Sequence, residues 1–516
     1  MIYRSPFPGV EIPDVTLHEL ILERARRWPE RVALVDGPSG AEMTYGQLVE
    51  RVDAVAAALA DGGFQAGEVA AIALPNSPEF TVAFLGIARA GGAATTMNTN
   101  FTEGEMAKQL ADSGAVVAFT TADLAAKVDA ATGGQLRRTF TLEYVRGLPA
   151  GRPPAVAVNP RAVVALPYSS GTTGAPKGVM LTHRNLVAMQ LQMEPVERTG
   201  PDDVSIAVLP FFHIYGLSVI LLLCLYRGSK LVIFPRFEME SFLSAIQRHR
   251  VTRLPLVPPL ILRLAQEPRL DDFDLTSVRT VISGAAPLPP EVAARLRQRL
   301  GGALVKQGYG MTELSPGGHM HAEDGSEPLP GSVGVLHPNT ECRLVDPETG
   351  ADAEPGGTGE IWYRGPQVMK GYLGRPEDTA AMITRDGWLR TGDVGRIDAD
   401  GQLYVVDRLK ELIKYKGFQV APAELEALLL THPAVADAAV IPKPDLEAGE
   451  IPKAFVVPAE GAAPTAEELM AFVSERVAGY KKVRELELVD EIPKSPSGKI
   501  LRRLLVVQER EKAARL

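Results

Sequence analysis

The sequence is poor in cysteine and has no apolar stretch long enough for a membrane span. Two cysteines among 516 residues, Cys224 and Cys342, are too few for a disulfide framework or a cysteine metal site, so each is expected to be a small core residue in a reducing compartment. The most apolar run, residues 217–225, is too short to cross a bilayer. The N-terminus lacks the charged and then apolar pattern of a secretory signal, and a cytoplasmic protein is expected.

A surplus of positive charge is also missing. The chain carries 54 Lys and Arg against 63 Asp and Glu, a formal net charge of −9. This balance argues against a general binder of nucleic acids or anionic membranes, so any polyanionic ligand must be bound by local basic clusters. The length favours about three domain-sized units. The 48 glycines and 41 prolines fit a large α/β enzyme with many loops.

Hydrophobic periodicity predicts alternating helices and short strands up to about residue 400, and therefore layered sheets with crossover helices. Helices are predicted over residues 17–28, 47–59, 80–89 and 217–225, and strands over residues 69–74, 204–210 and 230–234. Beyond residue 400 a hairpin turn and a charged stretch precede a second series of elements. These are strands at 413–415, 438–441 and 453–457 and a helix at 422–430. The change predicts a boundary at Arg408 to Lys410.

The most informative loop is residues 169–178, Ser-Ser-Gly-Thr-Thr-Gly-Ala-Pro-Lys-Gly, which lies between a strand-like run and a helix start. Its glycines and hydroxyl residues can turn several backbone N–H groups toward one point, and Lys177 adds positive charge. Such a loop binds anionic oxygen, so a polyphosphate is the expected ligand. It is not a Walker A motif, because glycine follows Lys177 where that motif needs Ser or Thr. A solvated turn of the same composition is the plainer alternative.

Five further segments carry residues suited to nucleotide or acid chemistry. His213 lies among aromatic residues after a predicted strand, and the small residues 283–287 allow a flat ligand to approach the backbone. Residues 307–313 combine a stackable tyrosine with a carboxylate suited to Mg²⁺. Asp393 is a natural partner for ribose hydroxyls, and Lys499 lies on a loop near the C-terminus. Taken singly, these are equally consistent with a packed histidine, surface turns and a solvated lysine.

Together and in this order, the segments resemble the adenylate-forming superfamily of acyl-CoA synthetases and luciferases, and within it the 4-coumarate/cinnamate-CoA ligase branch. The resemblance extends from Thr44 to Leu501. Its most specific segments are residues 168–177, 209–217, 283–288, 307–313, 359–365 and 411–426.

The resemblance implies an α/β fold of several domains. A large N-terminal domain of layered α/β subdomains would occupy residues 1–407, a hinge residues 408–410, and a small mobile α+β lid residues 411–516. It also implies ATP, Mg²⁺ and coenzyme A as ligands. A carboxylate would first form acyl-AMP and pyrophosphate, and the CoA thiol would then displace AMP to give a thioester.

The resemblance assigns individual residues to the nucleotide. The β- and γ-phosphates would be bound by Ser169, Ser170, Gly171, Thr172, Thr173, Gly174 and Lys177. The adenine and ribose would contact Ala285, Ala286, Gln307, Gly308, Tyr309, Asp393 and Arg408. Thr312 would contact the α-phosphate, Glu313 would bind Mg²⁺, and Lys499 would bridge the incoming carboxylate and the α-phosphate.

A moving lid is implied as well. Lys410 matches the family's hinge, about which the small domain swings between one pose for each half-reaction. Lys499 reaches the site in the first pose. In the second, Lys414 would contact the adenylate phosphate, and Lys416 and Gly417 would border the pantetheine. Arg236 stands where relatives carry a lysine that contacts a CoA phosphate.

The acyl pocket is expected to be lined by His213 and Tyr215, which also border the thiol tunnel, and by Gly284 and Pro316. The chain departs here from plant hydroxycinnamate ligases. Val219 stands in place of a serine, and Gly317 and Gly318 in place of two bulky aliphatic residues. The first change removes a polar anchor, and the glycines are expected to enlarge the ring end of the pocket. Cinnamate, bulkier ring-substituted acids and an unrelated apolar acid all stay open as substrates.

Other functions fit parts of the sequence. A medium-chain fatty acyl-CoA synthetase would use the same chemistry. An adenylation enzyme that loads a carrier protein is disfavoured because no carrier domain is recognisable and Arg236, Lys416 and Gly417 fit CoA. A non-catalytic nucleotide sensor would tolerate loss of Lys499 and Glu313, yet both are present. Nothing indicates a luciferase-like oxygenase, and the oligomeric state is left open.

Overall fold

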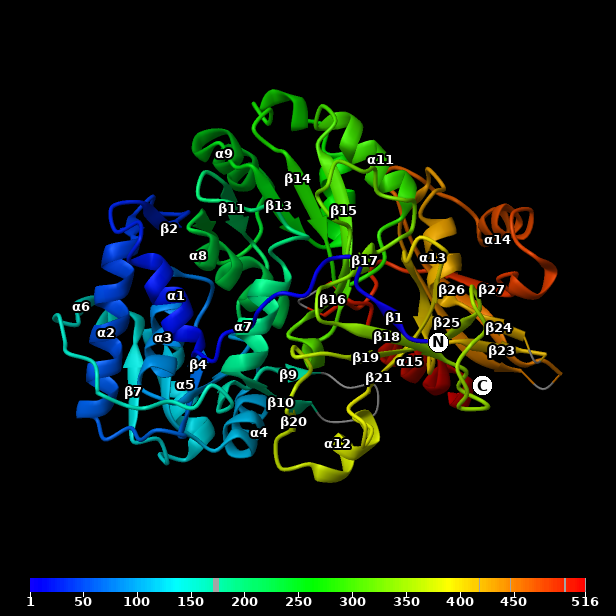
Figure 1. Ribbon diagram of the computed structural model, residues 1–516. Coiled ribbons are helices and arrows are strands. Elements are labelled where there is room, and N and C mark those ends of the chain that lie inside the picture. The colour runs from blue at the N-terminus through cyan, green and yellow to red at the C-terminus, as the bar shows by residue number, and fades with distance from the viewer. Residues whose placement is uncertain (170–175, 417, 446, 496–497, 516) are drawn as a thin grey trace.

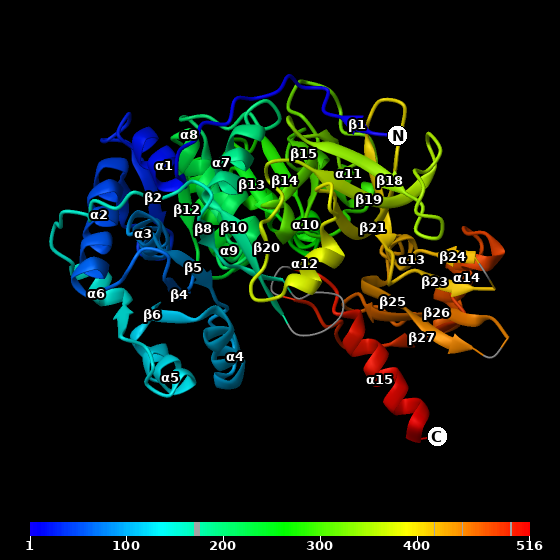
Figure 2. The same ribbon diagram turned by 60° about the horizontal axis from the view of Figure 1, so that its bottom comes forward.

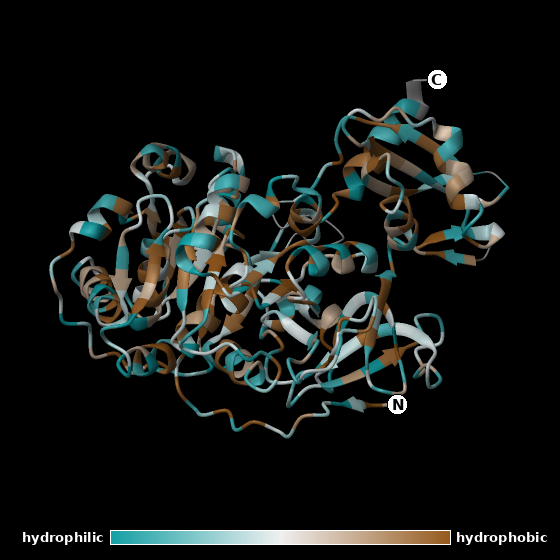
Figure 3. Ribbon diagram, turned by 90° about the horizontal axis from the view of Figure 1, so that it is seen from above, coloured by the Kyte–Doolittle hydropathy of each residue, from teal (hydrophilic) through white to brown (hydrophobic). Residues whose placement is uncertain are grey.

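The computed structural model describes residues 1–169, 176–416, 418–445, 447–495 and 498–515. Four β-sheets with their covering helices form a broad N-terminal body and a smaller C-terminal part (Figures 1 and 2). The predicted layered α/β architecture is confirmed. Apolar strands lie inside the layers and polar helix faces lie outside (Figure 3). Within the described residues, every helix is too short or too polar to cross a membrane.

The first sheet has the strand order β20-β10-β8-β5-β4-β6-β7, with β9 paired to β10. Its strands are β4 (Val69–Ala73), β5 (Ala93–Thr96), β6 (Ala115–Thr120), β7 (Arg138–Thr141), β8 (Val163–Ala165), β9 (Tyr168–Ser169), β10 (Lys177–Thr182) and β20 (Gly371–Tyr372). The helices of this region are α2 (Tyr45–Asp61), α3 (Pro78–Arg89), α4 (Glu103–Ser113), α5 (Ala122–Thr132) and α6 (Leu142–Gly147). Helices cover both faces of the parallel centre, which explains why β4 reads as a continuous apolar run.

The second sheet has the order β17-β16-β15-β14-β13-β11-β12-β2-β3. Its strands are β2 (Val32–Asp36), β3 (Glu42–Thr44), β11 (Val204–Ala207), β12 (Lys230–Ile233), β13 (Arg253–Leu256), β14 (Thr280–Ser283), β15 (Leu304–Gly310), β16 (Gly317–Met320) and β17 (Val335–Leu336). The helices of this region are α1 (Leu17–Ala25), α7 (His183–Gln192), α8 (Leu223–Arg227), α9 (Met239–His249), α10 (Pro258–Gln266), α11 (Pro290–Arg299) and the 3₁₀ turns η2 (Leu270–Asp272) and η3 (Thr312–Leu314).

The apolar helix expected at residues 217–225 begins with a π-helical segment, η1 (Tyr215–Leu222), which continues into α8. A π-helical segment is rare and is often found at functional sites. Gly216 is required at its start, because a Cβ there would lie 2.1 Å from the carbonyl oxygen of Pro210.

The third sheet has the order β1-β18-β19-β21-β22, and the fourth has the order β24-β23-β26-β25 with β27 paired to β26. The third contains β1 (Tyr3–Arg4), β18 (Glu341–Val345), β19 (Thr358–Arg364), β21 (Leu389–Ile397) and β22 (Leu403–Arg408), with α12 (Pro376–Met382) nearby. The fourth contains β23 (Ile413–Tyr415), β24 (Phe418–Val420), β25 (Val435–Asp445), β26 (Gly449–Pro458) and β27 (Glu485–Leu488). It is accompanied by α13 (Pro422–Leu429), α14 (Ala466–Ser474), η4 (Gly479–Lys481) and α15 (Arg502–Arg515). This last unit has an apolar cluster of its own, which includes Ile413, Val440 and Leu469.

The predicted elements recur with boundary shifts of a few residues. The helix expected at 17–28 ends at Ala25, where the chain turns, and the strand expected at 413–415 is β23. Both cysteines are free and buried, as predicted.

Candidate active site

The candidate active site is a pocket at the carboxyl ends of the parallel strands β14 and β15, where η1, η3 and the loop before α15 meet. Ligands of open α/β sheets commonly bind at this edge. Eleven of the predicted residues line it: His213, Tyr215, Val219, Gly284, Ala285, Gly308, Tyr309, Thr312, Pro316, Gly317 and Lys499. Segments far apart in the sequence thus converge on one cavity.

Glu313 is fixed by two hydroxyl groups. It is 5% exposed, and its Oε1 accepts hydrogen bonds from Ser169 Oγ at 3.0 Å and from the Tyr372 hydroxyl at 2.8 Å. Tyr372 lies in β20, and the sequence analysis missed it because a short Gly-Tyr strand has no motif of its own. Lys177 lies close by, with Nζ 5.2 Å from the centre of the Tyr372 ring.

Lys177 begins β10, and its Nζ donates to Asp378 Oδ1 of α12 at 2.7 Å. The other predicted members of the phosphate loop, Ser170, Gly171, Thr172, Thr173 and Gly174, lie outside the described residues, as does Gly417. The described edges of the loop, Ser169 and Lys177, are antiparallel partners in β9 and β10.

A second polar group gathers around Asp393. Its Oδ2 accepts from the Tyr309 hydroxyl at 2.6 Å, and its Oδ1 lies 3.6 Å from Arg408 Nε. The β21–β22 hairpin explains the pairing, because Asp393 and Arg408 are cross-strand partners. Burial raises the pKa of Asp393, although the Arg408 charge acts in the opposite direction. Tyr309 also stacks on Tyr363 at 6.1 Å between ring centres.

The turn after β14 brings its backbone to the pocket. Ala285 adopts a left-handed conformation with φ 72°, which is uncommon for a residue with a Cβ and typical of functional turns. Gln307 supports this turn, since its Oε1 accepts the Leu288 N–H at 2.9 Å. Ala286 and Gln307 do not line the pocket. The Gln307 side chain instead stabilises the turn after β14.

Lys499 lines the same pocket. Its backbone N–H donates to Ser495 Oγ at 3.1 Å, and its carbonyl accepts from the Ser495 N–H at 2.8 Å. Burial and the Arg408 charge lower the pKa of Lys499, against the opposing effect of Asp393, Glu313 and Glu411. The lysine is therefore placed among the predicted phosphate and ribose residues.

Three predicted residues, one at the proposed hinge and two in the C-terminal part, lie outside the pocket. Lys410, Lys414 and Lys416 are exposed, and β23, which carries Lys414, lies on the outer side of the C-terminal part (Figure 1). The Lys414 N–H donates to Glu450 Oε2 at 2.8 Å. Arg236 is likewise exposed, just after β12. None of these four described residues lines the pocket.

The apolar part of the pocket differs from the expectation at the two glycines. A Cβ on Gly317 would lie 2.7 Å from His337 Cε1 and 2.7 Å from Met189 Cε, and one on Gly318 would lie 2.8 Å from the Tyr363 ring. The expected enlargement is therefore absent from this described region, because neighbouring side chains fill the space. Gly318 faces Tyr363 and does not line the pocket. Val219 is buried against Met189, Met193 and Met320, as an apolar lining residue.

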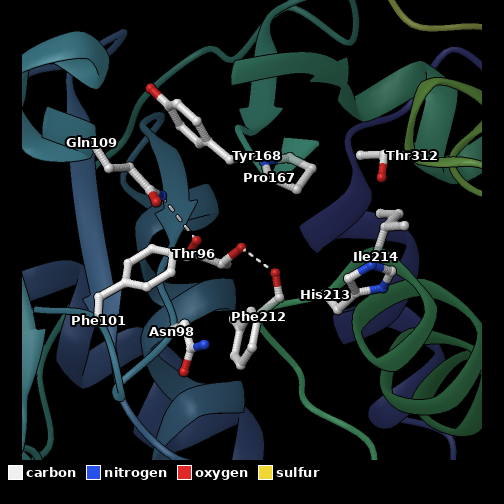
Figure 4. Close-up of a pocket in the computed structure, with 10 residues that line it drawn as sticks. All are labelled: Thr96, Asn98, Phe101, Gln109, Pro167, Tyr168, Phe212, His213, Ile214 and Thr312. Atoms are coloured by element: carbon white, nitrogen blue, oxygen red, sulfur yellow. Dashed lines mark hydrogen bonds between the residues drawn. The ribbon is translucent and has the colours of Figure 1, made fainter. Parts of the chain in front are cut away.

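A second, smaller pocket meets the first at His213, Ile214 and Thr312, which line both. Its other walls come from β5 and the chain that follows it into α4, from β9 and the residue before it, and from the loop before η1 (Figure 4). Thr96 Oγ1 donates to the Phe212 carbonyl at 2.7 Å, and the Thr96 carbonyl accepts from Gln109 Nε2 at 3.0 Å. These bonds fix the His213 loop against β5.

Acid is expected to destabilise the protein through its buried histidines. Burial lowers the pKa of His18 to about 4 and that of His183, His213 and His337 to about 3; Lys499 adds to the effect on His213. Below about pH 6.5 the unfolded chain binds more protons at these sites, so the free energy of unfolding falls as the pH falls. The slope is up to about 1.4 kcal/mol per pH unit for each histidine.

Urea unfolding between pH 7 and pH 4 measures this slope, and His183→Gln should make it shallower. A free energy of unfolding that stays constant over this range would contradict the assignment of neutral buried histidines.

Two family models match the chain. A model described as AMP-binding enzyme matches residues 21–373, and a model described as AMP-binding enzyme C-terminal domain matches residues 424–499. A curated relative, 4-coumarate–CoA ligase 5 of Oryza sativa subsp. japonica, is 45% identical over 97% of this chain and 96% of its own length. 4-Coumarate–CoA ligase 2 of Nicotiana tabacum is 45% identical, over 98% of this chain and 96% of its own length.

Solved structures are similar over nearly the whole chain. An anthranilate CoA ligase in complex with anthranoyl-AMP has a TM-score of 0.90 and 26% identity, covering 98% of this chain and 99% of that one. ATP-bound MatB from Rhodopseudomonas palustris has a TM-score of 0.87 and 30% identity, covering 95% of this chain and 98% of that one.

Proposed function

Because the chain belongs to the AMP-binding enzyme family, we propose that it ligates a carboxylic acid of the 4-coumarate type to coenzyme A, using ATP and an acyl-adenylate intermediate. The observation that carries the proposal is the convergence of Lys499, Thr312 and Tyr309 on one pocket whose remaining lining is largely apolar. Lys499 would supply the cation, Thr312 a contact to phosphate and Tyr309 a ring that stacks on adenine. All three lie next to a space suited to an aryl group.

In the first half-reaction, the acid attacks the α-phosphorus of ATP and pyrophosphate leaves. Two anions must approach each other, so positive charge near the reacting atoms stabilises the transition state. Lys499 is the cation placed to do this, and Thr312 contacts the α-phosphate. Asp393 and Arg408, already paired across the β21–β22 hairpin, bind the ribose hydroxyls. His213 stays neutral because burial lowers its pKa to about 3, so it adds no second charge.

The residues present can bind Mg²⁺, because they include a carboxylate, a donor that this ion prefers. The ion is commonly bound by one or two carboxylates together with substrate phosphates. Glu313 provides such a carboxylate, fixed at Oε1 by Ser169 and Tyr372. Among the described residues there is no cluster of three or more His, Cys, Asp or Glu that could bind a metal alone, which agrees with an ion that arrives with ATP. When bound, it would neutralise phosphate charge.

The second half-reaction requires a different position of the C-terminal part. We place the domain boundary at residues 408–410, with the large domain at 1–407 and the lid at 411–516. Lys499 is in the pocket while Lys414 and Lys416 are exposed, so the arrangement corresponds to adenylation. A rotation about Lys410 would exchange them, bringing Lys414 to the adenylate and Lys416 to the pantetheine. The second pocket, which reaches His213 from the first sheet, provides an approach for the thiol. A cytoplasmic location fits two free buried cysteines.

The test is CoA-dependent thioester formation with 4-coumarate, cinnamate and octanoate in the presence of ATP and Mg²⁺. We expect kcat/KM for the better aromatic acid to exceed that for octanoate by about tenfold or more, since the lining of the pocket includes His319 and His337, polar side chains that a plain alkyl chain would leave unpaired. A preference for octanoate would support the medium-chain fatty acid alternative. Adenylation with every acid but no thioester would support carrier-protein loading, and either result would overturn the proposal.

A further inference from the structure

The apolar part of the pocket contains two histidines that the proposed reaction does not use. His337 directly follows β17 and is 0% exposed, and His319 in β16 is 1% exposed. Both line the pocket. They lie near each other, because His319 pairs with Leu336 across the β16–β17 ladder and the His337 N–H donates to the Gly318 carbonyl at 3.1 Å.

Three of their four ring nitrogens have no hydrogen-bond partner among the described residues. These are Nδ1 and Nε2 of His337 and Nε2 of His319. The fourth, His319 Nδ1, lies 2.5 Å from the Tyr363 hydroxyl. Buried polar atoms are nearly always paired in folded proteins, and leaving them unpaired is costly. Because both side chains line the cavity, a polar group on a bound ligand can supply the missing partner.

Both rings are neutral at physiological pH. Burial, followed by the charge of Lys306, lowers the pKa of His337 to about 3, and burial lowers that of His319 well below its usual value. A neutral imidazole donates from one nitrogen and accepts at the other. It therefore suits a hydroxyl group, which also donates and accepts, and it lacks the positive charge that a second carboxylate would need.

The lack of a side chain at Gly317 makes room for the His337 ring. A side chain at position 317 would place its Cβ 3.2 Å from His337 Nδ1 and 2.7 Å from Cε1. Met189 lies against the same glycine and belongs to the apolar cluster that contains Val219. The His337 ring thus occupies the volume that a bulky aliphatic side chain at position 317 would fill. It also places a polar group in a region where Val219 has none.

We propose that His337, assisted by His319, recognises a hydroxyl group on the aromatic ring of the acid, so that the enzyme discriminates hydroxylated from unsubstituted aryl acids. The inference rests on the proposed acid–CoA ligation and specifies its substrate class. His337 donates to or accepts from the hydroxyl, while the unpaired Nε2 of His319 offers a second partner, its Nδ1 being occupied by the Tyr363 hydroxyl.

The experiment compares pyrophosphate release with 4-coumarate and with cinnamate, two acids that differ by one ring hydroxyl. We expect the wild-type kcat/KM ratio to favour 4-coumarate by about tenfold or more, because a site with buried polar groups rejects a ligand that leaves them unpaired. His337→Leu should lower this ratio about tenfold, since leucine fills a similar volume without a polar atom. His319→Leu should lower it less.

His321→Leu is the matched control. His321 follows β16 two residues after His319, is outside the pocket lining, and its Nε2 is already bonded to the Ser326 carbonyl at 3.1 Å. The ratio should stay at its wild-type value in this variant. An unchanged ratio in both His337→Leu and His319→Leu, or an equal fall in His321→Leu, would overturn the inference. His319→Leu keeps the test decisive if His337→Leu does not fold. A wild-type protein that releases no pyrophosphate with any acid would instead contradict the proposed function itself.

Discussion

Lys499→Ala should reduce acid-dependent adenylation by about 10³-fold, while thioester formation from supplied acyl-AMP should change by less than about tenfold. Lys499 reaches the pocket that contains Thr312 and His213, and Asp393 and Glu313 are close enough to affect its pKa. In the proposed mechanism its charge stabilises the phosphorus centre at which the carboxylate and ATP, two anions, meet, and no such meeting occurs when the thiol attacks. Separate measurement of the two half-reactions, by pyrophosphate release and by thioester formation from acyl-AMP, checks the asymmetry.

Lys494→Ala is the control for this variant. Lys494 precedes Lys499 by five residues in the same segment, but its Nζ is paired with Asp437 at 2.6 Å outside the pocket. Its loss should leave both half-reactions close to the wild-type rate. If Lys499→Ala slowed both half-reactions equally, the residue would have a general structural role and the proposed contact with the transition state would be wrong.

Lys410→Pro should produce the opposite asymmetry. We expect thioester formation to fall by about 10²-fold and adenylation by less than about threefold, because proline fixes φ at the hinge and restricts the residue before it. In the proposed domain alternation, the arrangement with Lys499 in the pocket is the one for adenylation, so a stiff hinge would leave that step possible. In the proposed second step Lys414, which is exposed on β23 in this arrangement, would have to reach the adenylate. The readouts are the same two half-reactions.

Lys410→Ala separates the backbone effect from the side chain. It removes the charge of an exposed lysine but keeps the torsional freedom, and it should therefore retain most thioester formation. A Lys410→Pro enzyme that loses both half-reactions to the same degree, or neither, would place the pivot elsewhere in the chain.

The proposed nucleotide-binding residues could be named from sequence because they come in contiguous motifs at strand ends. Thr312 and Glu313 begin η3, one residue after the end of β15, and Asp393 lies in β21 opposite Arg408. Strand ends can be located from hydrophobic patterns, and parallel strands bring their carboxyl ends to one edge. A contiguous motif of this kind can therefore be interpreted before the fold is known.

Side-chain partnerships across the fold were not predictable in this way. Tyr372 fixes Glu313 from 59 residues away, and no local pattern links them. The two glycines after Pro316 indicated an enlarged pocket only because their neighbours were unknown. His337, just after β17, and Tyr363, in β19, fill the space. The histidines at 319, 321 and 337 were a usable signal, since histidine is uncommon in this chain, with 8 among 516 residues.

Exchange of labelled pyrophosphate into ATP in the absence of CoA reports whether this pocket forms an acyl-adenylate. We predict exchange that requires both Mg²⁺ and an aromatic carboxylic acid and that is lost in Lys499→Ala. Absence of exchange with every aromatic and aliphatic acid offered to correctly folded wild-type protein would contradict the account.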